Sequence, residues 1–373
     1  MLYQTYVQIS SGNIKSNLKL IRQIVGEQRK ILIAVKANAY GHGIVQVARL
    51  AEISGIDWLG IATVPEGIKI RNGGINLPIL KFSPPFPEEM PACIQYKLSP
   101  TVCEYENIKV LQKICDSMHK VIDVHLKVDT GMGRIGAKIS DAPVLAKFIE
   151  TECPNLSLGG IFTHLPSSSE IDKTYTDHQI LSFKVVVNNI QEIIGRKVEI
   201  AHCSNSAGVL GYESSLMDMV RPGIIAYGLY PSYDIPRDVP LKPALSFFSR
   251  VSFIKQVEAG ASIGYDRSWI APCKTMIATI SVGYADGFNR LFSNRGRVLI
   301  HGHSFPIVGK VCMDQSMINL GHHTDIQVGD EVVLIGRSGA EEITCEDWAQ
   351  VLDTIPYEIT SQINSRVERI YVQ

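Results

Sequence analysis

Short apolar and β-branched runs alternate with longer amphipathic stretches over the first two-thirds of the chain. This alternation is typical of βα units on a parallel sheet. The apolar runs predict strands at 31–35, 58–62, 78–82, 97–102, 121–128, 156–163, 198–202 and 217–221. The stretches between them predict helices at 13–25, 43–54, 108–117, 141–151 and 177–194. Asn13 and Asp141 are candidate N-caps, because a short polar side chain can accept from unpaired first-turn N–H groups.

About eight βα repeats over roughly 230 residues match the length of a (β/α)8 barrel of the TIM type. An open, doubly wound sheet is the alternative arrangement of the same units. No GxGxxG motif follows a predicted strand to support that alternative. We therefore predict an α/β protein whose N-terminal domain, residues 1–235, is a (β/α)8 barrel.

The pattern changes after Tyr230. The segment PSYDIPRDVPLKP has four prolines in thirteen residues and is typical of a connection between domains. Beyond it, strand-like runs separated by Gly, Asp and Asn turns lie at 245–258, 275–282, 297–300, 303–307, 317–320 and 331–335. Helical patterns are sparse and lie at 345–352 and 356–361. Residues 236–373 are therefore predicted to form a second, mainly-β domain.

Composition narrows the class of protein. The formal net charge is -1 and no block of like charges occurs, so neither nucleic acid nor a membrane surface is an expected partner. The first residues lack a basic region followed by an apolar run, and no stretch approaches the roughly 20 apolar residues of a membrane span. The eight cysteines are scattered without a CxxC pair, which favours reduced thiols over a disulfide scaffold or a zinc site. We expect a cytoplasmic protein without a metal.

Reactive side chains follow several predicted strands at their C-terminal ends, where (β/α)8 barrels carry their active sites. They are Lys36 after the first strand, Lys127, Asp129 and Arg134 at and after the fifth, Thr163 and His164 at the end of the sixth, His202, Asn205 and Ser206 at the end of the seventh, and Arg221 at the end of the eighth. No pair of carboxylates stands among them, and no two of these histidines have the spacing of metal ligands. A metallohydrolase site is therefore disfavoured.

A lysine and a candidate phosphate site share this end of the predicted barrel. A buried lysine can lose its proton and form an imine with a carbonyl group. Barrel phosphate sites use the loops after the seventh and eighth strands, which here read SNSAG and RPGIIAYG. Ser206 offers a hydroxyl there, and Gly223 lets the backbone approach an anion. This combination suggests pyridoxal 5'-phosphate, although a solvated or ion-paired lysine remains the alternative at this point.

Longer motifs extend the pattern over the whole chain. They read AVKANAYGHG, HLKVDTGMGRIG, SNSAG, VRPGIIAYG, SIGYDR, SVGYADGF, VGKVCMDQ and YEITSQINSRVERIYV. In these motifs and their order the chain resembles the alanine racemase family. The resemblance implies a (β/α)8 barrel, a C-terminal β domain that also packs the N-terminal strand at 3–9, and a homodimer with shared active sites. It also implies a pyridoxal-phosphate racemase that supplies D-alanine for peptidoglycan.

The resemblance assigns the two acid/base groups. Lys36 matches the lysine that holds the cofactor as an aldimine and acts on one face of the substrate Cα. Tyr265 matches the tyrosine that reaches over from the other subunit to the opposite face, as a two-base mechanism needs. Arg221 matches the arginine that faces the pyridine nitrogen and keeps it unprotonated. The implied cofactor-binding set beside Lys36 is Tyr40, His164, Asn205, Ser206, Arg221, Gly223 and Ile224.

Further positions match groups around the substrate. Arg134 matches the arginine near the substrate carboxylate, and Lys127 matches a lysine often found as a carbamate that orients it. Met313 matches the residue whose backbone N–H meets the substrate carboxylate from the partner subunit. Tyr284 matches the tyrosine that lines the entrance. His164 matches the histidine between the cofactor-facing arginine and the partner's tyrosine.

One departure bears on specificity. Many family members carry a tyrosine near the end of the chain beside the phosphate, where this sequence has Asn364 and Ser365. Loss of the aromatic side chain makes a serine or broad-specificity racemase the first alternative. Pyridoxal-phosphate decarboxylases of a similar barrel set an acidic residue against the pyridine nitrogen, and Arg221 argues against them. A non-catalytic carrier of the cofactor, built on a lone barrel, is disfavoured by the second domain.

Overall fold

The computed structural model describes residues 3–322 and 325–373. The chain divides into two compact units. One unit is Ile14–Lys242, and the other joins the residues up to Asn13 with Pro243–Gln373. Within the described residues, no helix combines the length and the apolar character needed to cross a bilayer.

Eight parallel strands form the sheet of the first unit, in the order β8-β7-β6-β5-β4-β3-β2-β9. They are β2 (Lys30–Ala34), β3 (Trp58–Ile61), β4 (Ile79–Lys81), β5 (Leu98–Val102), β6 (Ile122–Lys127), β7 (Leu156–Phe162), β8 (Ile200–His202) and β9 (Met219–Val220). Beside the two end strands, the Asp218 N–H donates to Ala201 O at 3.1 Å and the Arg221 N–H to Ser204 O at 2.8 Å. These bonds link the ends of the sheet into a nearly closed barrel, so the predicted fold class is confirmed.

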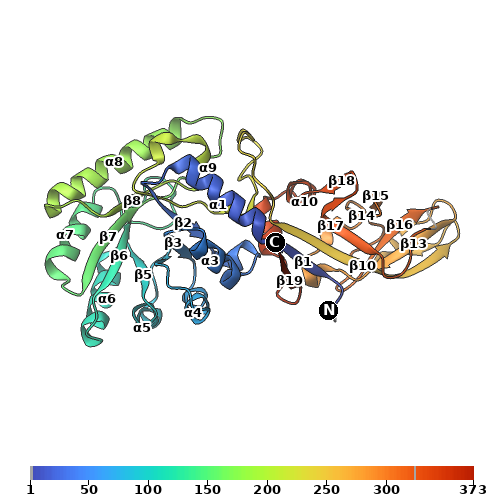
Figure 1. The fold of residues 1–373 in the computed structure, drawn as a ribbon, viewed down its shortest axis with the longest axis horizontal. Helices are drawn as coiled ribbons and strands as arrows, with labels where there is room; N and C mark the ends of the chain where they lie inside the picture. The colour runs from blue at the N-terminus through green and yellow to red at the C-terminus, as the bar shows by residue number, and fades with distance from the viewer. Residues whose placement is uncertain (1–2, 323–324) are drawn as a thin grey trace. The chain divides into compact units, whose positions relative to one another are not determined.

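Helices surround the strands (Figure 1). They are α1 (Ser11–Val25), α3 (Ile44–Ile53), α4 (Val64–Asn72), α5 (Met90–Gln95), α6 (Tyr105–Ser117), α7 (Ala142–Glu152), α8 (Thr174–Ile194) and α9 (Ser206–Gly211). Each long helix buries one apolar face, as α1 does through Ile14, Leu18, Ile21 and Val25 at helical spacing. The barrel is therefore a packed two-layer structure in which the mouth, and not the interior, is free to bind a ligand.

The N-cap predictions need correction. Helix α1 begins at Ser11, and the Ser10 hydroxyl oxygen accepts from the Asn13 N–H at 3.1 Å, so Asn13 lies inside the first turn and its prediction as N-cap is wrong. Asp141 does hold the N-cap position of α7, but its carboxylate accepts from the Ser140 hydroxyl at 2.7 Å and makes no capping bond. In both cases a neighbouring serine makes the local hydrogen bond: Ser10 accepts the Asn13 N–H, and Ser140 donates to the Asp141 carboxylate.

The second unit is mainly β-sheet. Its strands are β1 (Tyr6–Ser10), β10 (Leu245–Val257), β11 (Ser262–Ile263), β12 (Trp269–Ile270), β13 (Thr275–Ile280), β14 (Arg297–Ile300), β15 (His303–Pro306), β16 (Ser316–Gly321), β17 (Glu331–Ser338), β18 (Glu341–Ile343) and β19 (Glu368–Val372). Strand β1 pairs antiparallel with β10 and parallel with β19, so the N-terminal strand belongs to this unit, as expected from the resemblance.

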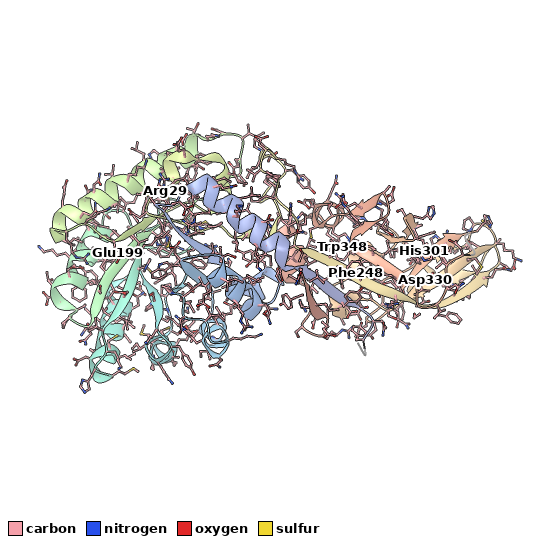
Figure 2. The ribbon with its side chains drawn as sticks, viewed as in Figure 1. Arg29, Glu199, Phe248, His301, Asp330 and Trp348 are labelled. Atoms are coloured by element: carbon pink, nitrogen blue, oxygen red, sulfur yellow. The ribbon has the colours of Figure 1, made fainter. Side chains whose placement is uncertain are left out.

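Two helices follow the strands of this unit, α10 (Cys345–Leu352) and α11 (Pro356–Ser361). An aromatic cluster packs α10 against the sheet. The Trp348 ring of α10, labelled in Figure 2, has its centroid 4.6 Å from that of Phe292 and 5.3 Å from that of Phe288. Phe247 of β10 completes the group at 6.0 Å. All four rings are buried, and aromatic burial of this size supplies much of the energy of a small core.

Gly160 of β7 makes room for a histidine inside the barrel. A Cβ atom at this position would overlap the ring of His125, which is fully buried. We expect Gly160→Ala to lower the free energy of unfolding by about 1–3 kcal/mol, the usual cost of overpacking a core. Urea denaturation measures this change. Gly211→Ala is the matched control, because nothing lies within 4 Å of its added methyl group. Equal losses in the two variants would contradict the packing argument.

Candidate active site

The chain makes an unusual turn directly after β2. In α2 (Lys36–Tyr40), the residues Ala37, Asn38, Ala39 and Tyr40 have φ values of 51° to 55°, which is a left-handed conformation. Such a conformation costs about 1–2 kcal/mol for each non-glycine residue. Hydrogen bonds offset part of this cost: Ala37 N–H donates to the Glu66 carboxylate at 2.7 Å, and the Asn38 side-chain oxygen accepts from a backbone N–H at 3.0 Å. Strain held in this way is common at functional sites.

Lys36 stands at the start of this turn, with its side chain half-buried. Burial lowers the pKa of its ammonium group, the positive charge of Arg134 lowers that pKa further, and Glu66 opposes them. A lowered pKa raises the fraction of neutral amine at physiological pH. A neutral lysine amine can act as a nucleophile or as a base.

Tyr40, Ser206 and Gly223 come together at the same end of the barrel. The Ser206 hydroxyl oxygen accepts from the Gly223 N–H at 2.8 Å, and a Cβ atom at Gly223 would lie 2.8 Å from the Tyr40 hydroxyl. Only glycine therefore leaves space between these two loops. Asn205 holds the Ser206 loop by accepting a backbone N–H of α9 at 2.9 Å, and Ile224 begins the short helix η3 (Ile224–Tyr227). Two hydroxyl groups around a glycine-lined space fit the phosphate of pyridoxal phosphate.

Arg221 is buried and held by hydrogen-bond acceptors. It donates to both Nδ1 and the carbonyl oxygen of His202 at 2.9 Å and to Thr163 O at 2.6 Å. Because a guanidinium can only donate, His202 Nδ1 must accept. Burial and the charge of Arg221 keep the pKa of His202 well below its usual value, so this ring is neutral. Its remaining proton is on Nε2, which lies 3.0 Å from Nδ1 of His125.

Arg221, held in place by His202 of this histidine pair, keeps its positive charge. Burial lowers the pKa of Arg221 to about 10, and so the guanidinium keeps its proton at neutral pH. Among the described residues no carboxylate is paired with it. A rigid guanidinium without an acidic partner repels a proton from any basic nitrogen placed before it.

Lys127, Arg134 and His164 complete the group around Lys36 and Arg221. Burial lowers the pKa of Lys127 to about 8, and the charges of Arg134 and Arg221 contribute. Burial also holds the pKa of His164 well below its usual value, and Arg221, Arg134, Lys127 and Lys36 all act in the same direction. The 3.5 Å contact between Arg221 and His164, together with the mutual effect of these charges, indicates that the five predicted side chains lie near one another. Their excess of positive charge suits an anionic ligand.

The predicted residues of the second unit are exposed. The exposed fractions are 66% for Tyr265, 42% for Tyr284 and 53% for Met313. Tyr265 begins η4 (Tyr265–Arg267), and Tyr284 begins η5 (Tyr284–Asp286). The Tyr284 N–H donates to Cys312 O at 3.1 Å, which places the loops of Tyr284 and Met313 side by side. Large apolar side chains that are left exposed together are typical of a contact with another molecule.

Some residues of the site were not predicted. Glu66 follows Thr63 at the spacing of a capping box, so the sequence could have indicated that Glu66 caps α4. Its hydrogen bond with the Ala37 N–H has no such signal in the sequence. His125 looks like an ordinary member of a buried strand. His202 was predicted to lie at the end of a strand, but its contact with Arg221 was not predicted. Asp286, which organises the Tyr284 loop, has its strongest partner 80 positions away in the sequence.

Comparison with known proteins shows which family the chain resembles. A family model described as "Alanine racemase, N-terminal domain" matches residues 9–231, and one described as "Alanine racemase, C-terminal domain" matches residues 244–371. The chain is 43% identical over 372 residues to a Cutibacterium acnes protein named alanine racemase, with 98% of this chain and 96% of that protein covered.

Solved structures agree as well. An alanine racemase from Clostridium difficile 630 superposes with a TM-score of 0.96 at 38% identity, covering 100% of this chain and 96% of that one. An alanine racemase from Bacillus anthracis with bound L-Ala-P superposes with a TM-score of 0.94 at 34% identity, covering 100% and 95%.

Lys127 is a buried cation, and its removal is expected to stabilise the protein in a pH-dependent way. The pKa of Lys127 falls from 10.5 to about 8 on folding, so the unfolded chain binds the proton more tightly. The free energy of unfolding of the wild type therefore rises as the pH rises from 8 to 10.5. We expect Lys127→Met to be more stable by about 3 kcal/mol near pH 7, since one pKa unit is worth about 1.4 kcal/mol. The difference should shrink toward pH 10.5.

Urea denaturation at several pH values in CO2-free buffer measures this difference. The exposed Lys138 supplies the matched control, because Lys138→Met removes an ammonium group that is already in water. A stability gain from Lys127→Met that does not change with pH would show that the buried charge is not its cause.

Proposed function

Because the chain belongs to the alanine racemase family, we propose that it interconverts L- and D-alanine by moving the Cα proton between two protein groups. The family depends on pyridoxal phosphate. The observation that carries the proposal is the position of Lys36: its amine has a lowered pKa and shares one barrel mouth with a phosphate cradle and a fixed arginine.

The residues of the mouth would hold the cofactor at three points. Lys36 would bind its carbonyl carbon, Tyr40 and Ser206 with the backbone at Gly223 and Ile224 would bind its phosphate, and Arg221 would face its ring nitrogen. The bound cofactor withdraws electrons from the amino acid and so makes the Cα proton acidic. Arg221 limits this effect, because a guanidinium disfavours protonation of the ring nitrogen. That restraint favours return of the proton to Cα over other outcomes and disfavours the decarboxylase alternative.

Racemisation needs one proton-transfer group on each face of Cα. We assign one face to Lys36 and the other to Tyr265 of a second copy of the chain, which makes the working enzyme a homodimer. The exposure of Tyr265, Tyr284 and Met313 supports a role for this surface at a subunit contact.

The remaining groups orient the substrate and the catalytic pair. Arg134 and the partner's Met313 backbone N–H would bind the substrate carboxylate, and the partner's Tyr284 would line the entrance. His164 lies 3.5 Å from Arg221 and would connect it to the partner's tyrosine. The amine of Lys127 has a pKa of about 8, so a substantial neutral fraction is present near pH 8 and can react with CO2 to give the carbamate that would orient Arg134.

We place the enzyme in the cytoplasm, where it would supply D-alanine for peptidoglycan. A serine or broad-specificity racemase is the second candidate, and two residues favour it. Asn364 and Ser365 are small and polar where many relatives carry a tyrosine. The Asn364 side-chain oxygen accepts from the Arg366 N–H at 3.1 Å, so its position is fixed. A small polar pair leaves room for a hydroxymethyl group.

Purified protein loaded with pyridoxal phosphate should racemise L-alanine with a higher kcat/KM than L-serine, as measured by chiral chromatography of both products. Borohydride should fix the cofactor onto Lys36, and Lys36→Ala should lose both the label and the activity. Ser365→Tyr should lower activity on serine more than activity on alanine, because the added ring fills the space beside the substrate. A preference for L-serine would support the second candidate, and racemisation of neither amino acid would refute both.

Complementation between two inactive variants tests the shared site. Tyr265→Phe keeps the ring but removes the hydroxyl, so turnover should fall by about 100- to 10,000-fold, the usual contribution of an acid/base group. Mixed dimers with Lys36→Ala would contain one site with both groups intact, provided that the subunits exchange. Each mixed dimer should then have up to about half of the wild-type activity by counting sites. Mixed dimers verified by mass spectrometry that stay inactive would rule out a tyrosine supplied by the partner.

A further inference from the structure

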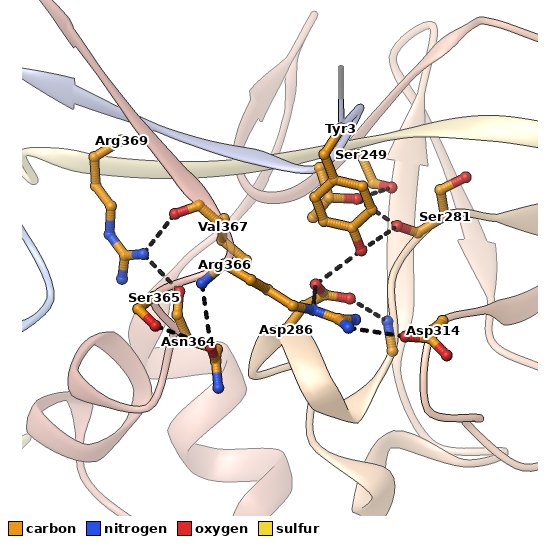
Figure 3. A network of polar contacts seen from close by, with 12 residues as sticks. Tyr3, Ser249, Ser281, Asp286, Asp314, Asn364, Ser365, Arg366, Val367 and Arg369 are labelled. Carbon is orange, nitrogen blue, oxygen red and sulfur yellow. Dashed lines mark hydrogen bonds and ion pairs between the residues drawn. The ribbon is translucent and has the colours of Figure 1, made fainter. Parts of the chain in front are cut away.

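A buried carboxylate organises the loop that carries Tyr284. Asp286 is fully buried, and its oxygens accept from the Tyr3 hydroxyl at 2.8 Å, from the Gly283 N–H at 2.9 Å and from Arg366 Nε at 2.7 Å (Figure 3). A buried charge with these three donors is well satisfied, and two of the donors come from distant parts of the sequence. Asp286 therefore fixes one end of the Arg366 side chain.

The other end of Arg366 reaches a different loop. Its terminal NH1 donates to the Asp314 carboxylate at 2.9 Å, so one guanidinium bridges the buried Asp286 and the exposed Asp314 (Figure 3). Asp314 directly follows Met313. Charge-assisted hydrogen bonds are about twice as strong as neutral ones, and the rigid fork of arginine fixes direction as well as distance.

Backbone contacts hold the opposite side of the Met313 turn. The Ala285 N–H donates to Met313 O at 3.0 Å, and a Cβ atom at Gly283 would overlap the Met313 backbone. The side chains of the turn itself contribute little burial, since Met313 is 53% exposed and the Asp314 side chain is 61% exposed. The turn is thus held between the Tyr284 loop and Arg366 rather than by a core of its own.

We propose that Arg366 is a positioning residue of the racemase: through Asp286 and Asp314 it fixes the turn at Met313 so that the Met313 backbone N–H can bind the substrate carboxylate. This inference rests on the proposed function. In this proposal Arg366 acts only through the geometry of the turn, by way of its contacts with Asp286 and Asp314. Its loss should therefore weaken binding of the carboxylate and leave the proton-transfer groups Lys36 and Tyr265 in place.

The test compares Arg366→Gln, Asp314→Asn and the control Arg369→Gln in the full-length protein loaded with pyridoxal phosphate. Arg369 belongs to the same segment but donates to the backbone carbonyls of Ile363, Asn364 and Val367. We expect Arg366→Gln and Asp314→Asn to raise the KM for L-alanine and the inhibition constant of propionate about 10-fold, the worth of one hydrogen bond to a charged group. The kcat should change by less than about threefold, and Arg369→Gln should leave all three constants near their wild-type values.

Hydrogen exchange provides a readout independent of activity. Amides of a peptide that spans residues 310–316 should exchange faster in Arg366→Gln and Asp314→Asn than in the wild type and in Arg369→Gln. Asp314 is exposed, so Asp314→Asn keeps the test valid if Arg366→Gln fails to fold. Unchanged exchange and an unchanged KM in an active racemase would overturn this inference and leave the proposed function intact. An equal rise in KM for Arg369→Gln would overturn it as well, and a wild type without racemase activity would overturn both.

Discussion

Positive charge held out of water at the mouth of the barrel is the condition on which the rest of the site depends. Arg221 and Lys127 are buried and Lys36 is half-buried, so each loses hydration that an exposed cation would keep. The site compensates in different ways. Arg221 is hydrogen-bonded to carbonyl oxygens and to a neutral imidazole, whereas the two lysines respond with lowered pKa values. A carboxylate beside Arg221 would neutralise the cation that disfavours protonation of the cofactor's ring nitrogen.

The left-handed turn after β2 follows from the same requirement. The left-handed turn after Lys36 ends at Tyr40, whose hydroxyl lies 2.8 Å from the position that a Cβ atom at Gly223 would take. The small side chains of Ala37 and Ala39 keep the steric cost of this conformation low. Glu66 then holds the turn by its backbone and moderates the pKa of Lys36 at the same time. Glu66, which lies outside the turn, therefore both stabilises the strained backbone of the turn and influences the pKa of Lys36.

Periodicity predicted the eight barrel strands and the main strands of the second unit to within about three residues, because burial of one face leaves a local signal in the sequence. It missed the short strands β11, β12 and β18, where two or three residues carry too little pattern. It also missed the five-residue strand β19 and misplaced the cap of α1. The grouping of strand-terminal side chains at one mouth was predictable from barrel topology. The residues that hold those side chains in place were not predictable. Glu66, His125 and Asp286 act through tertiary contacts that have no fixed sequence spacing.

Strand β1 has a consequence for how the chain folds. Its partners β10 and β19 come only after the whole barrel sequence, so the barrel is an insertion between two paired strands of one sheet. While the barrel is unfolded, closing that sheet means closing a very long loop, at an entropic cost that grows with the logarithm of loop length. A folded barrel replaces the flexible loop by a rigid body with fixed ends. Because the N-terminal part of a chain generally folds first during synthesis, we expect the barrel to form while β1 is still unpaired and the sheet of the second unit to be completed last.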